Sequence, residues 1–362
     1  MQILNPDNAI DRNRWLQLWQ ASGKEPFAHP GYVELYAGED TKARCALHET
    51  NAGLVFYPFL LRSIPGEIRT KPATTPAFDI ISPYGYGGPL PVEKQPEKVA
   101  PDAANATPSF QKEQKTALFN GFYRDFHRWA CENNIISEFV RFFLFSEARE
   151  HYYGLVEYNN DNVVCDLQRP EEALWKSLQP KVRRRVRSAL KRGLMVEQDV
   201  TWASLNDFIE VYYSTMRRLN AKSFYYFPKA FFESLKASLG EQCQLFNVRY
   251  ENQTVASMLL LTSESRVYSF LSGGLRSFFH LSGNDLLQYH SIRWALESGF
   301  RIYVMGGGYQ RNDGIFAFKE AFAPGSTLPF YTGKTIFNQD AYDSLSAGKA
   351  QDTGFFPAYR VR

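Results

Sequence analysis

Long hydrophobic runs are absent from the 362-residue sequence. Its most apolar stretches, such as MLLL at 258–261, fall far short of the roughly 18 residues that a membrane-spanning helix needs. The first residues have neither a basic start nor an apolar core, so no signal peptide is predicted. We therefore expect a cytoplasmic protein without a transmembrane segment, and peripheral contact with a membrane surface stays open.

Cysteine is scarce as well. The four cysteines (Cys45, Cys131, Cys165 and Cys243) are scattered and form no CxxC pair, which argues against a disulfide framework and against a structural zinc site. The six histidines show no metal-ligand spacing either. We expect no metal and no bound cofactor.

A strong net charge is also lacking. The value of +3 is too small to indicate a nucleic-acid-binding protein by itself. The charge is concentrated, however, because residues 176–192 contain eight basic residues and no acidic one. A helix predicted over 181–192, ending at Gly193, carries most of them. Such a helix suits the phosphates of a tRNA or of a nucleotide-linked sugar, and a solvated face beside an acidic neighbour is the competing interpretation.

The length suggests two domains. The first is expected over 1–155 and the second over 156–329. The polar segment 91–115 has almost no large apolar side chains and is predicted to be a mobile surface insertion. Outside the most informative stretch, we expect strands at 43–48, 54–61, 137–143 and 162–167, and helices at 116–132, 172–178, 181–192 and 204–219.

The stretch from 242 to 323 is the most informative. It alternates as three strands at 242–250, 254–262 and 266–271, followed by a helix at 284–298. A fourth strand at 301–305 leads into Gly306, Gly307 and Gly308, and a short helix follows at 314–322. Three meandering strands, a helix, a strand, a glycine loop and a helix follow the order of the acyl-CoA half of a GNAT domain.

Particular residues add to this order. The chain resembles the Fem-type transferases of the GNAT superfamily in FYPFLLR at 56–62, SPYGYGGP at 82–89, SEFVRF at 137–142, LW at 174–175 with KVRRRVR at 181–187, NDLL at 284–287, MGGG at 305–308 and FKEAF at 318–322. The resemblance implies an α+β fold with two GNAT-like domains, each a mixed central sheet flanked by helices. It also implies that residues 330–362 pack back on the first domain. Many relatives follow the Arg-Phe pair of 141–142 with His-Pro, whereas Phe143 and Leu144 follow it here, so substrate contacts near this strand should differ.

The same resemblance implies the activity. It predicts an acyl or aminoacyl transferase acting on an amino group of a cell-envelope precursor, either peptidoglycan or a polysaccharide amino sugar. The acceptor would be a small or lipid-linked precursor, and the donor co-substrate aminoacyl-tRNA or acyl-CoA. Two alternatives stay open, namely an acetyl-CoA-dependent GNAT acetyltransferase and a non-catalytic protein that binds tRNA or a nucleotide sugar.

Three residues are candidates for catalysis. Lys319 lies three or four positions from Ile315, Phe316 and Phe322 on its predicted helix, so it is not on an ordinary solvated face. In the Fem-type family the lysine of this motif lies at the active site. Asp313 precedes the helix and is either a base or an N-cap, and Tyr268 is either a donor-site tyrosine or a core tyrosine. Candidates for substrate binding are Tyr84, Tyr86, Arg141, Arg217, Arg218, Gly306, Gly307, Gly308 and Tyr309.

The donor depends on HLSGND at 280–285. Acyl-CoA-dependent GNAT enzymes bind pyrophosphate with Arg/Gln-x-x-Gly-x-Gly/Ala at a helix N-terminus. Only Gly283 is kept here, and Asp285 places a negative charge where phosphate should bind. This favours aminoacyl-tRNA over acetyl-CoA. The candidates for donor binding are Lys181, Arg184, Arg185, Arg187, Gly283 and Asn284.

Overall fold

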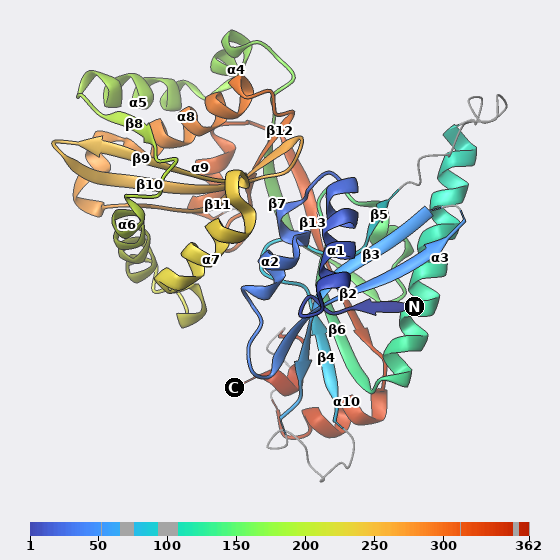
Figure 1. Ribbon diagram of the computed structural model, residues 1–362. Coiled ribbons are helices and arrows are strands. Elements are labelled where there is room, and N and C mark those ends of the chain that lie inside the picture. Colours follow the sequence, from blue (N-terminus) through green and yellow to red (C-terminus); the bar gives the residue numbers. More distant parts are fainter. Residues whose placement is uncertain (52, 66–75, 93–107, 312, 350–354, 362) are drawn as a thin grey trace. The chain divides into compact units, whose positions relative to one another are not determined.

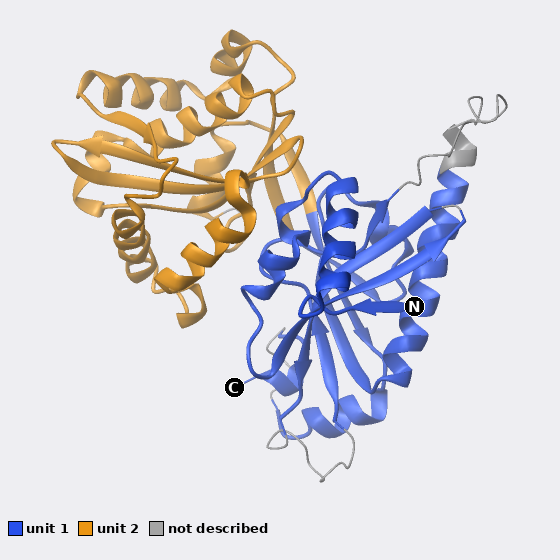
Figure 2. Cartoon of the chain, viewed as in Figure 1, with its two compact units in different colours: residues 1–159, 330–362 blue, residues 160–329 orange. Residues whose placement is uncertain are grey.

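The computed structural model describes residues 1–51, 53–65, 76–92, 108–311, 313–349 and 355–361. The chain forms two compact units, residues 1–159 with 330–362 and residues 160–329 (Figure 2). Most of the predicted insertion, 93–107, lies outside the described residues. Its two ends are regular structure, because residues 91 and 92 belong to a strand and residues 108–115 to a long helix. That helix begins eight residues before the expected position.

Unit 1 is built on a mixed sheet in the order β1-β2-β3-β4-β6-β13, with β5 paired to β3. Among the described strands of this unit, β4 and β6 pair in parallel and the other neighbours pair antiparallel. The strands are β1 (Gln2–Leu4), β2 (Thr41–Thr50), β3 (Gly53–Ser63), β4 (Phe78–Ile81), β5 (Leu90–Val92), β6 (Ile135–Arg141) and β13 (Thr327–Ile336).

Helix α3 (Pro108–Glu132) covers one face of this sheet (Figure 1). Its apolar spacing places Phe119, Phe122 and Phe126 in the core against Tyr57 and Phe59 of β3. Each fully buried phenylalanine of this kind contributes about 1.5–3 kcal/mol. The other helices of the unit are α1 (Ala9–Ala21), α2 (Pro30–Glu34) and α10 (Gln339–Ser346).

The C-terminal segment is fastened to β4 through one buried carboxylate. Asp79, which is fully buried, accepts hydrogen bonds from Arg62 Nε at 2.6 Å, Arg360 Nε at 2.8 Å and the Tyr359 hydroxyl at 3.1 Å. Two guanidinium groups therefore compensate one carboxylate inside the protein. The contact joins β3 and β4 to the segment that carries Tyr359 and Arg360.

Unit 2 has a mixed sheet in the order β7-β12-β11-β10-β9-β8. Strands β11 and β12 are parallel and their other neighbours antiparallel. The strands are β7 (Leu155–Asp166), β8 (Met195–Gln198), β9 (Cys243–Tyr250), β10 (Gln253–Thr262), β11 (Arg266–Gly274) and β12 (Ile302–Gly306). The chain passes from one unit to the other within β7 and within β13.

Helices cover both faces of the second sheet (Figure 1). Helices α5 and α8 pack together on one face over a core that includes Val182, Val186 and Leu286. Helices α6 and α7 cover the other, where Phe208 and Phe232 meet edge to face at 5.2 Å. The helices are α4 (Glu171–Ser177), α5 (Pro180–Lys191), α6 (Leu205–Arg218), α7 (Lys229–Leu239), α8 (Gly283–Glu297) and α9 (Gly314–Glu320). The α+β class expected from the sequence is confirmed.

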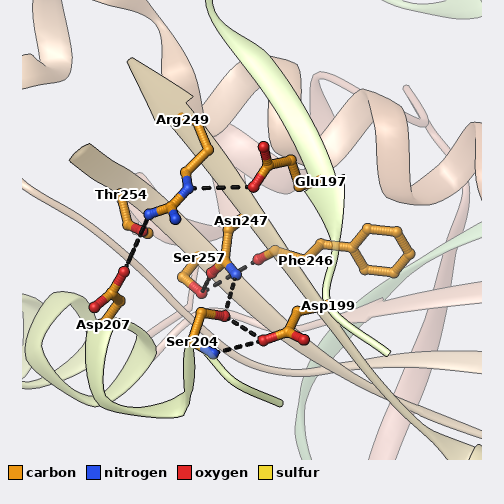
Figure 3. Close-up of polar contacts among 9 residues, drawn as sticks. All are labelled: Glu197, Asp199, Ser204, Asp207, Phe246, Asn247, Arg249, Thr254 and Ser257. Atoms are coloured by element: carbon orange, nitrogen blue, oxygen red, sulfur yellow. Dashed lines mark hydrogen bonds and ion pairs between the residues drawn. The ribbon is translucent and has the colours of Figure 1, made fainter. Parts of the chain in front are cut away.

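A buried polar network ties the start of α6 to the sheet (Figure 3). Asn247 accepts a hydrogen bond from Ser257 Oγ at 2.5 Å and donates one to Ser204 Oγ at 2.7 Å. Ser204 in turn donates to Asp199 from its hydroxyl and its backbone N–H. Burial would raise the pKa of Asp199, but these hydrogen bonds and one from Thr201 lower it to about 2. Asp199 thus stays ionised, and both of its carboxylate oxygens accept hydrogen bonds.

A second polar group lies beside this network (Figure 3). Arg249 of β9 pairs with Glu197 of β8 at 3.2 Å and with Asp207 of α6 at 3.1 Å. The two groups fix α6 against β8 and β9.

None of the helices within the described ranges combines the length and apolar character needed to cross a bilayer.

Candidate active site

The second sheet opens where β11 and β12 part. The two strands pair over only three described positions, the last of which joins Tyr268 to Val304. A register shift next to this point leaves Phe270 opposite no residue of β10, and bulges of this kind bend a strand away from its neighbour. Tyr268 is 3% exposed, so it is buried at the last of these paired positions, and its role at the donor site stays a prediction.

The glycine loop follows β12 at this opening. Gly306 has φ of +78°, a conformation that side chains rarely adopt. A Cβ on Gly307 would lie 2.7 Å from Asn160 Nδ2 and 2.8 Å from the Asp161 carbonyl of β7. Asn160 Nδ2 also donates to the Gly308 carbonyl at 3.3 Å. The glycines are therefore required for the loop to lie directly against β7.

Lys319 of α9 reaches back to this loop. Its Nζ donates to the Gly307 carbonyl at 2.7 Å, and a Cβ on Gly306 would lie 3.5 Å from the same nitrogen. The side chain is partly buried, and this desolvation lowers its pKa to about 8 although Asp313 acts to raise it. The expectation that Lys319 avoids an ordinary solvated face agrees with this position.

Asp313 is the N-cap of α9. Its carboxylate accepts hydrogen bonds from the backbone N–H groups of Phe316, Tyr309 and Gln310 at 2.7–2.9 Å. Burial would raise the pKa of Asp313, but these backbone donors lower it. A carboxylate so occupied is a weak base, and the capping interpretation of Asp313 explains its contacts. Tyr309 gives only its N–H to this cap, and its side chain is 68% exposed.

Substitution of Gly307 tests how closely this loop must fit. We expect Gly307→Ala to reduce turnover by up to about 100-fold, because a displacement near 1 Å of a group at the site can cost that much. The new methyl group must push the loop, and with it the carbonyl that binds Lys319, away from β7. The matched control is Gly38→Ala in unit 1, where no atom lies within 4 Å of the added Cβ. Steady-state kinetics and melting temperatures of both variants would measure the effect. Unchanged turnover in Gly307→Ala would contradict the requirement that the loop lie directly against β7.

A pocket of about 420 Å³ lies at the N-terminus of α8. Backbone N–H groups at a helix N-terminus favour anions. The predicted donor residues Gly283 and Asn284 line the pocket together with Arg185 and Asp285. A neighbouring pocket of about 220 Å³ shares Arg185, Asp285 and Phe318 and includes Lys181.

The structure places a positive charge beside Asp285. Its carboxylate is 3.4 Å from Arg185 Nη1, so its negative charge is offset inside the pocket. Burial raises the pKa of Asp285, and Arg185 opposes that rise. A phosphate group in this pocket would therefore meet an ion pair and not an isolated carboxylate.

Some basic side chains of helix α5 contact neighbouring residues, and others are exposed to solvent. Arg183 donates to the carbonyls of Lys176 and Leu178, and Arg187 lies over the Trp175 ring at 5.3 Å. Lys181, Arg184 and Lys191 are exposed, and within the described residues no acidic side chain pairs with them. Their spacing places them in one stripe along the helix, which we call the α5 stripe. Lys181, at one end, also lines the smaller pocket.

The remaining candidates for substrate binding in this unit, Arg217 and Arg218, lie at the C-terminal end of α6. Arg217 and Arg218 are exposed in its last turn, where cations are favoured by the helix dipole. Arg218 lies over the Phe279 ring at 5.1 Å. The structure does not bring them into the pocket at α8.

Unit 1 brings three predicted substrate residues together. Arg141 donates from its backbone N–H to Ser82 Oγ at 3.0 Å, which joins β6 to the loop that carries Tyr84 and Tyr86. The Tyr84 carbonyl accepts a hydrogen bond from the Tyr32 hydroxyl at 2.7 Å. The ring of Tyr86 packs edge to face on Phe27 at 5.2 Å. The glycines of this loop are needed because it lies directly on aromatic side chains.

Two residues with clear places at the site were not predicted. Asn160 touches the glycine loop, and its Oδ1 is buried with no hydrogen-bond partner among the described residues. Phe318 lines both pockets from α9. Phe318 belongs to the FKEAF motif at 318–322, but the motif alone does not show that it lines a pocket. Nothing in the sequence indicates a role for Asn160. Among the described residues no group of three His, Cys, Asp or Glu is placed to hold a metal ion.

Comparisons with known proteins bear on the domain and the fold. Residues 176–320 match the family model described as an acetyltransferase (GNAT) domain. No curated protein sequence matches the chain. Among solved structures, FemX is similar with a TM-score of 0.65 and 15% identity, over 95% of this chain and 99% of that one.

Two further structures are similar over most of their length. The C-terminal domain of a protein from Agrobacterium fabrum, assigned as a lysylphosphatidylglycerol synthetase, has a TM-score of 0.53 and 13% identity, over 93% of this chain and 94% of that one. L-PGS from Bacillus licheniformis has a TM-score of 0.53 and 12% identity, over 92% and 93%. At these identities the likeness shows a shared fold, and it confirms the fold expected from the resemblance.

Proposed function

We propose that this chain, an N-acyltransferase whose residues 176–320 form a GNAT domain, transfers an aminoacyl group from aminoacyl-tRNA to an amine of a cell-envelope precursor. The observation that supports aminoacyl-tRNA as the donor is the α5 stripe. Lys181, at one end of the stripe, also lines the smaller pocket at α8. Phosphates of an acceptor stem would lie along the stripe, and the aminoacylated end would enter the pocket. Such a donor places the reaction in the cytoplasm.

The proposed chemistry needs no covalent enzyme intermediate. The neutral amine of the acceptor attacks the ester carbonyl of the donor, a C–N bond forms, and the C–O bond to the ribose breaks. The proton lost by the amine leaves with the ribose hydroxyl. The ammonium of Lys319, held on the Gly307 carbonyl, would stabilise the negative charge that develops on the carbonyl oxygen.

The envelope acceptor rests on the resemblance to Fem-type transferases and on the neighbours in fold. A lysylphosphatidylglycerol synthetase, by its name, makes an aminoacylated lipid. The Arg141, Tyr84 and Tyr86 group of unit 1 offers a cation and aromatic rings for a phosphorylated or sugar-containing acceptor.

Acetyl-CoA is the second candidate donor. Arg185 offsets the charge of Asp285, and the pocket at α8 offers a helix N-terminus with apolar walls. The non-catalytic alternative is not retained, because residues 176–320 match an acetyltransferase domain.

Thermal stabilisation by the donor tests this proposal. A ligand present at about one hundred times its dissociation constant should stabilise the fold by about 2.7 kcal/mol. We expect aminoacyl-tRNA to raise the melting temperature and acetyl-CoA to leave it unchanged. A shift with acetyl-CoA alone would replace the proposal with the second candidate.

Neutralising the α5 stripe makes the test specific. In Lys181→Gln/Arg184→Gln/Lys191→Gln, the slope of log affinity against log salt for aminoacyl-tRNA should fall by about two to three. The matched control is Arg124→Gln/Arg128→Gln on α3, two exposed arginines of unit 1. An equal slope in the stripe variant and the parent protein would exclude the stripe as the tRNA site.

A further inference from the structure

A surface of unit 2 beside the pocket at α8 combines basic and apolar side chains, and one of its members, Phe279, also lines that pocket. It consists of the end of α6, the loop from α6 to α7, and the short 3-10 helix at Arg276–Leu281. We call it the α6 patch; its members are Arg217, Arg218, Leu219, Lys222, Phe224, Arg276 and Phe279. The loop lies at one end of the unit (Figure 1).

The charge of this patch has one sign. From 211 to 232 the sequence has four basic residues and no acidic one. In the described part of the chain, no carboxylate forms an ion pair with Arg217, Arg218, Lys222 or Arg276. Burial lowers the pKa of Arg218, and the neighbouring Arg276 lowers it further. Cations held this close together, with no counter-charge, favour an anionic surface.

Its apolar side chains are unusually exposed. Phe224 is 55% exposed, Leu219 45% and Phe279 40%. The rest of the loop is well held, since the Tyr212 hydroxyl donates to the Tyr225 carbonyl and the Tyr213 hydroxyl to the Phe227 carbonyl, both at 2.7 Å. The fold thus fixes the backbone and leaves about half of Phe224 exposed, with its ring against Tyr225 and Phe227.

We infer that the α6 patch binds the surface of an anionic lipid bilayer. Its cations would contact lipid phosphates, and Leu219, Phe224 and Phe279 would enter the boundary between head groups and acyl chains. A nucleic acid would also attract the cations, and Phe224 and Phe279 offer rings on which bases stack. Leu219 offers no ring, and an exposed aliphatic side chain among cations favours lipid. The inference goes beyond the transfer reaction and does not depend on which donor is used.

Vesicle co-sedimentation of the full chain tests this inference without any acyl donor. We expect binding to vesicles of phosphatidylcholine mixed with phosphatidylglycerol, little binding to phosphatidylcholine alone, and weaker binding at higher salt. In Arg218→Gln/Arg276→Gln the partition coefficient should fall by roughly 30-fold, since each basic residue near an anionic surface contributes about a factor of five. Phe224→Ser should lower it by about fivefold.

Matched variants separate the patch from general surface effects. Ile10→Ser removes an apolar side chain of α1 that is 78% exposed, and Arg128→Gln removes an exposed cation of α3. Both should leave vesicle binding unchanged. Failure of the parent protein to bind the anionic vesicles, or equal binding by the patch variants, would overturn the inference. Patch variants that lose tRNA affinity and keep vesicle binding would make this surface a nucleic-acid site instead.

Discussion

Replacement of Lys319 with methionine is expected to lower kcat by about 100- to 1000-fold, the usual loss when one stabilising charge or donor is removed from an acyl-transfer site. Methionine has a similar length but cannot donate to the Gly307 carbonyl or carry charge. The matched control is Lys42→Met, because Lys42 Nζ also donates to a glycine carbonyl, that of Gly38 at 3.1 Å, on the surface of unit 1. Equal losses of kcat in both variants would exclude a special role for Lys319.

The pH dependence of turnover tests the charge itself. The pKa of Lys319 is lowered to about 8, so the parent enzyme should lose activity as the pH rises through that value. Lys319→Arg keeps a positive charge over this range, so its residual activity should not fall near pH 8. An alkaline limb that is the same in the parent and the arginine variant would assign the titration to another group.

The same pKa shift predicts how stability responds. The native state holds the Lys319 proton less tightly than the unfolded chain, whose lysine titrates near 10.4. Charging this side chain therefore opposes folding below pH 8, and the opposition disappears as the pH rises towards the unfolded value. Lys319→Met should consequently be no less stable than the parent at pH 7. A large fall in melting temperature would show that Lys319 is chiefly structural.

Removal of the Asp79 carboxylate should have the largest effect on stability. Asp79→Ala leaves Arg62 and Arg360 without the carboxylate that each contacts inside the protein. Breaking a buried ion pair by removing one partner typically costs 3–5 kcal/mol, and we expect about that loss in the free energy of unfolding. Urea denaturation monitored on unit 1 tryptophans would measure it.

A surface ion pair supplies the control for Asp79. Glu49 pairs with Arg14 at 3.4 Å, and both side chains are more than a third exposed. Glu49→Ala should therefore cost less than about 1 kcal/mol. If Asp79→Ala proved as mild as this control, the buried contact would not be what holds the C-terminal segment.

The parts of the fold that could be predicted from the sequence are those with local signals. The strands and helices between 242 and 323 were predicted to within a few residues, because turn residues separate them and their apolar periods are clear. The exception is β11, which continues to Gly274 and includes three residues expected to form a loop. Pairing with β10 overrides the glycine signal there.

Other elements depend on distant partners and were not predicted. Strand β13 contains Pro329 and Gly333, which argue against a strand, but it is held by β6 in a register that joins Thr332 to Arg141. The four-residue strands β4 and β8 are too short for a periodic signal, and the same holds for β1. Helix α7 was missed although Phe231, Phe232 and Leu235 lie on one buried face.

The candidate site also has residues that local sequence signals predict and residues whose contacts depend on distant partners. Lys319 could be singled out because its apolar neighbours lie on its own helix. The contact between Asn160 and the glycine loop could not, because it depends on a shift in register between β7 and β12 near Gly306. The pairing of Asp285 with Arg185 could not be predicted for a similar reason, since the two residues lie one hundred positions apart in the chain.

The two passages of the chain between units, within β7 and within β13, bear on the order of biosynthesis. Unit 1 needs residues 330–362, which leave the ribosome after all of unit 2. Until then β6 lacks its partner β13, and Asp79 lacks Arg360. Unit 2 is contiguous over 160–329 and can complete its sheet first. A nascent chain halted before residue 330 would therefore expose an open sheet edge, the kind of surface that chaperones bind.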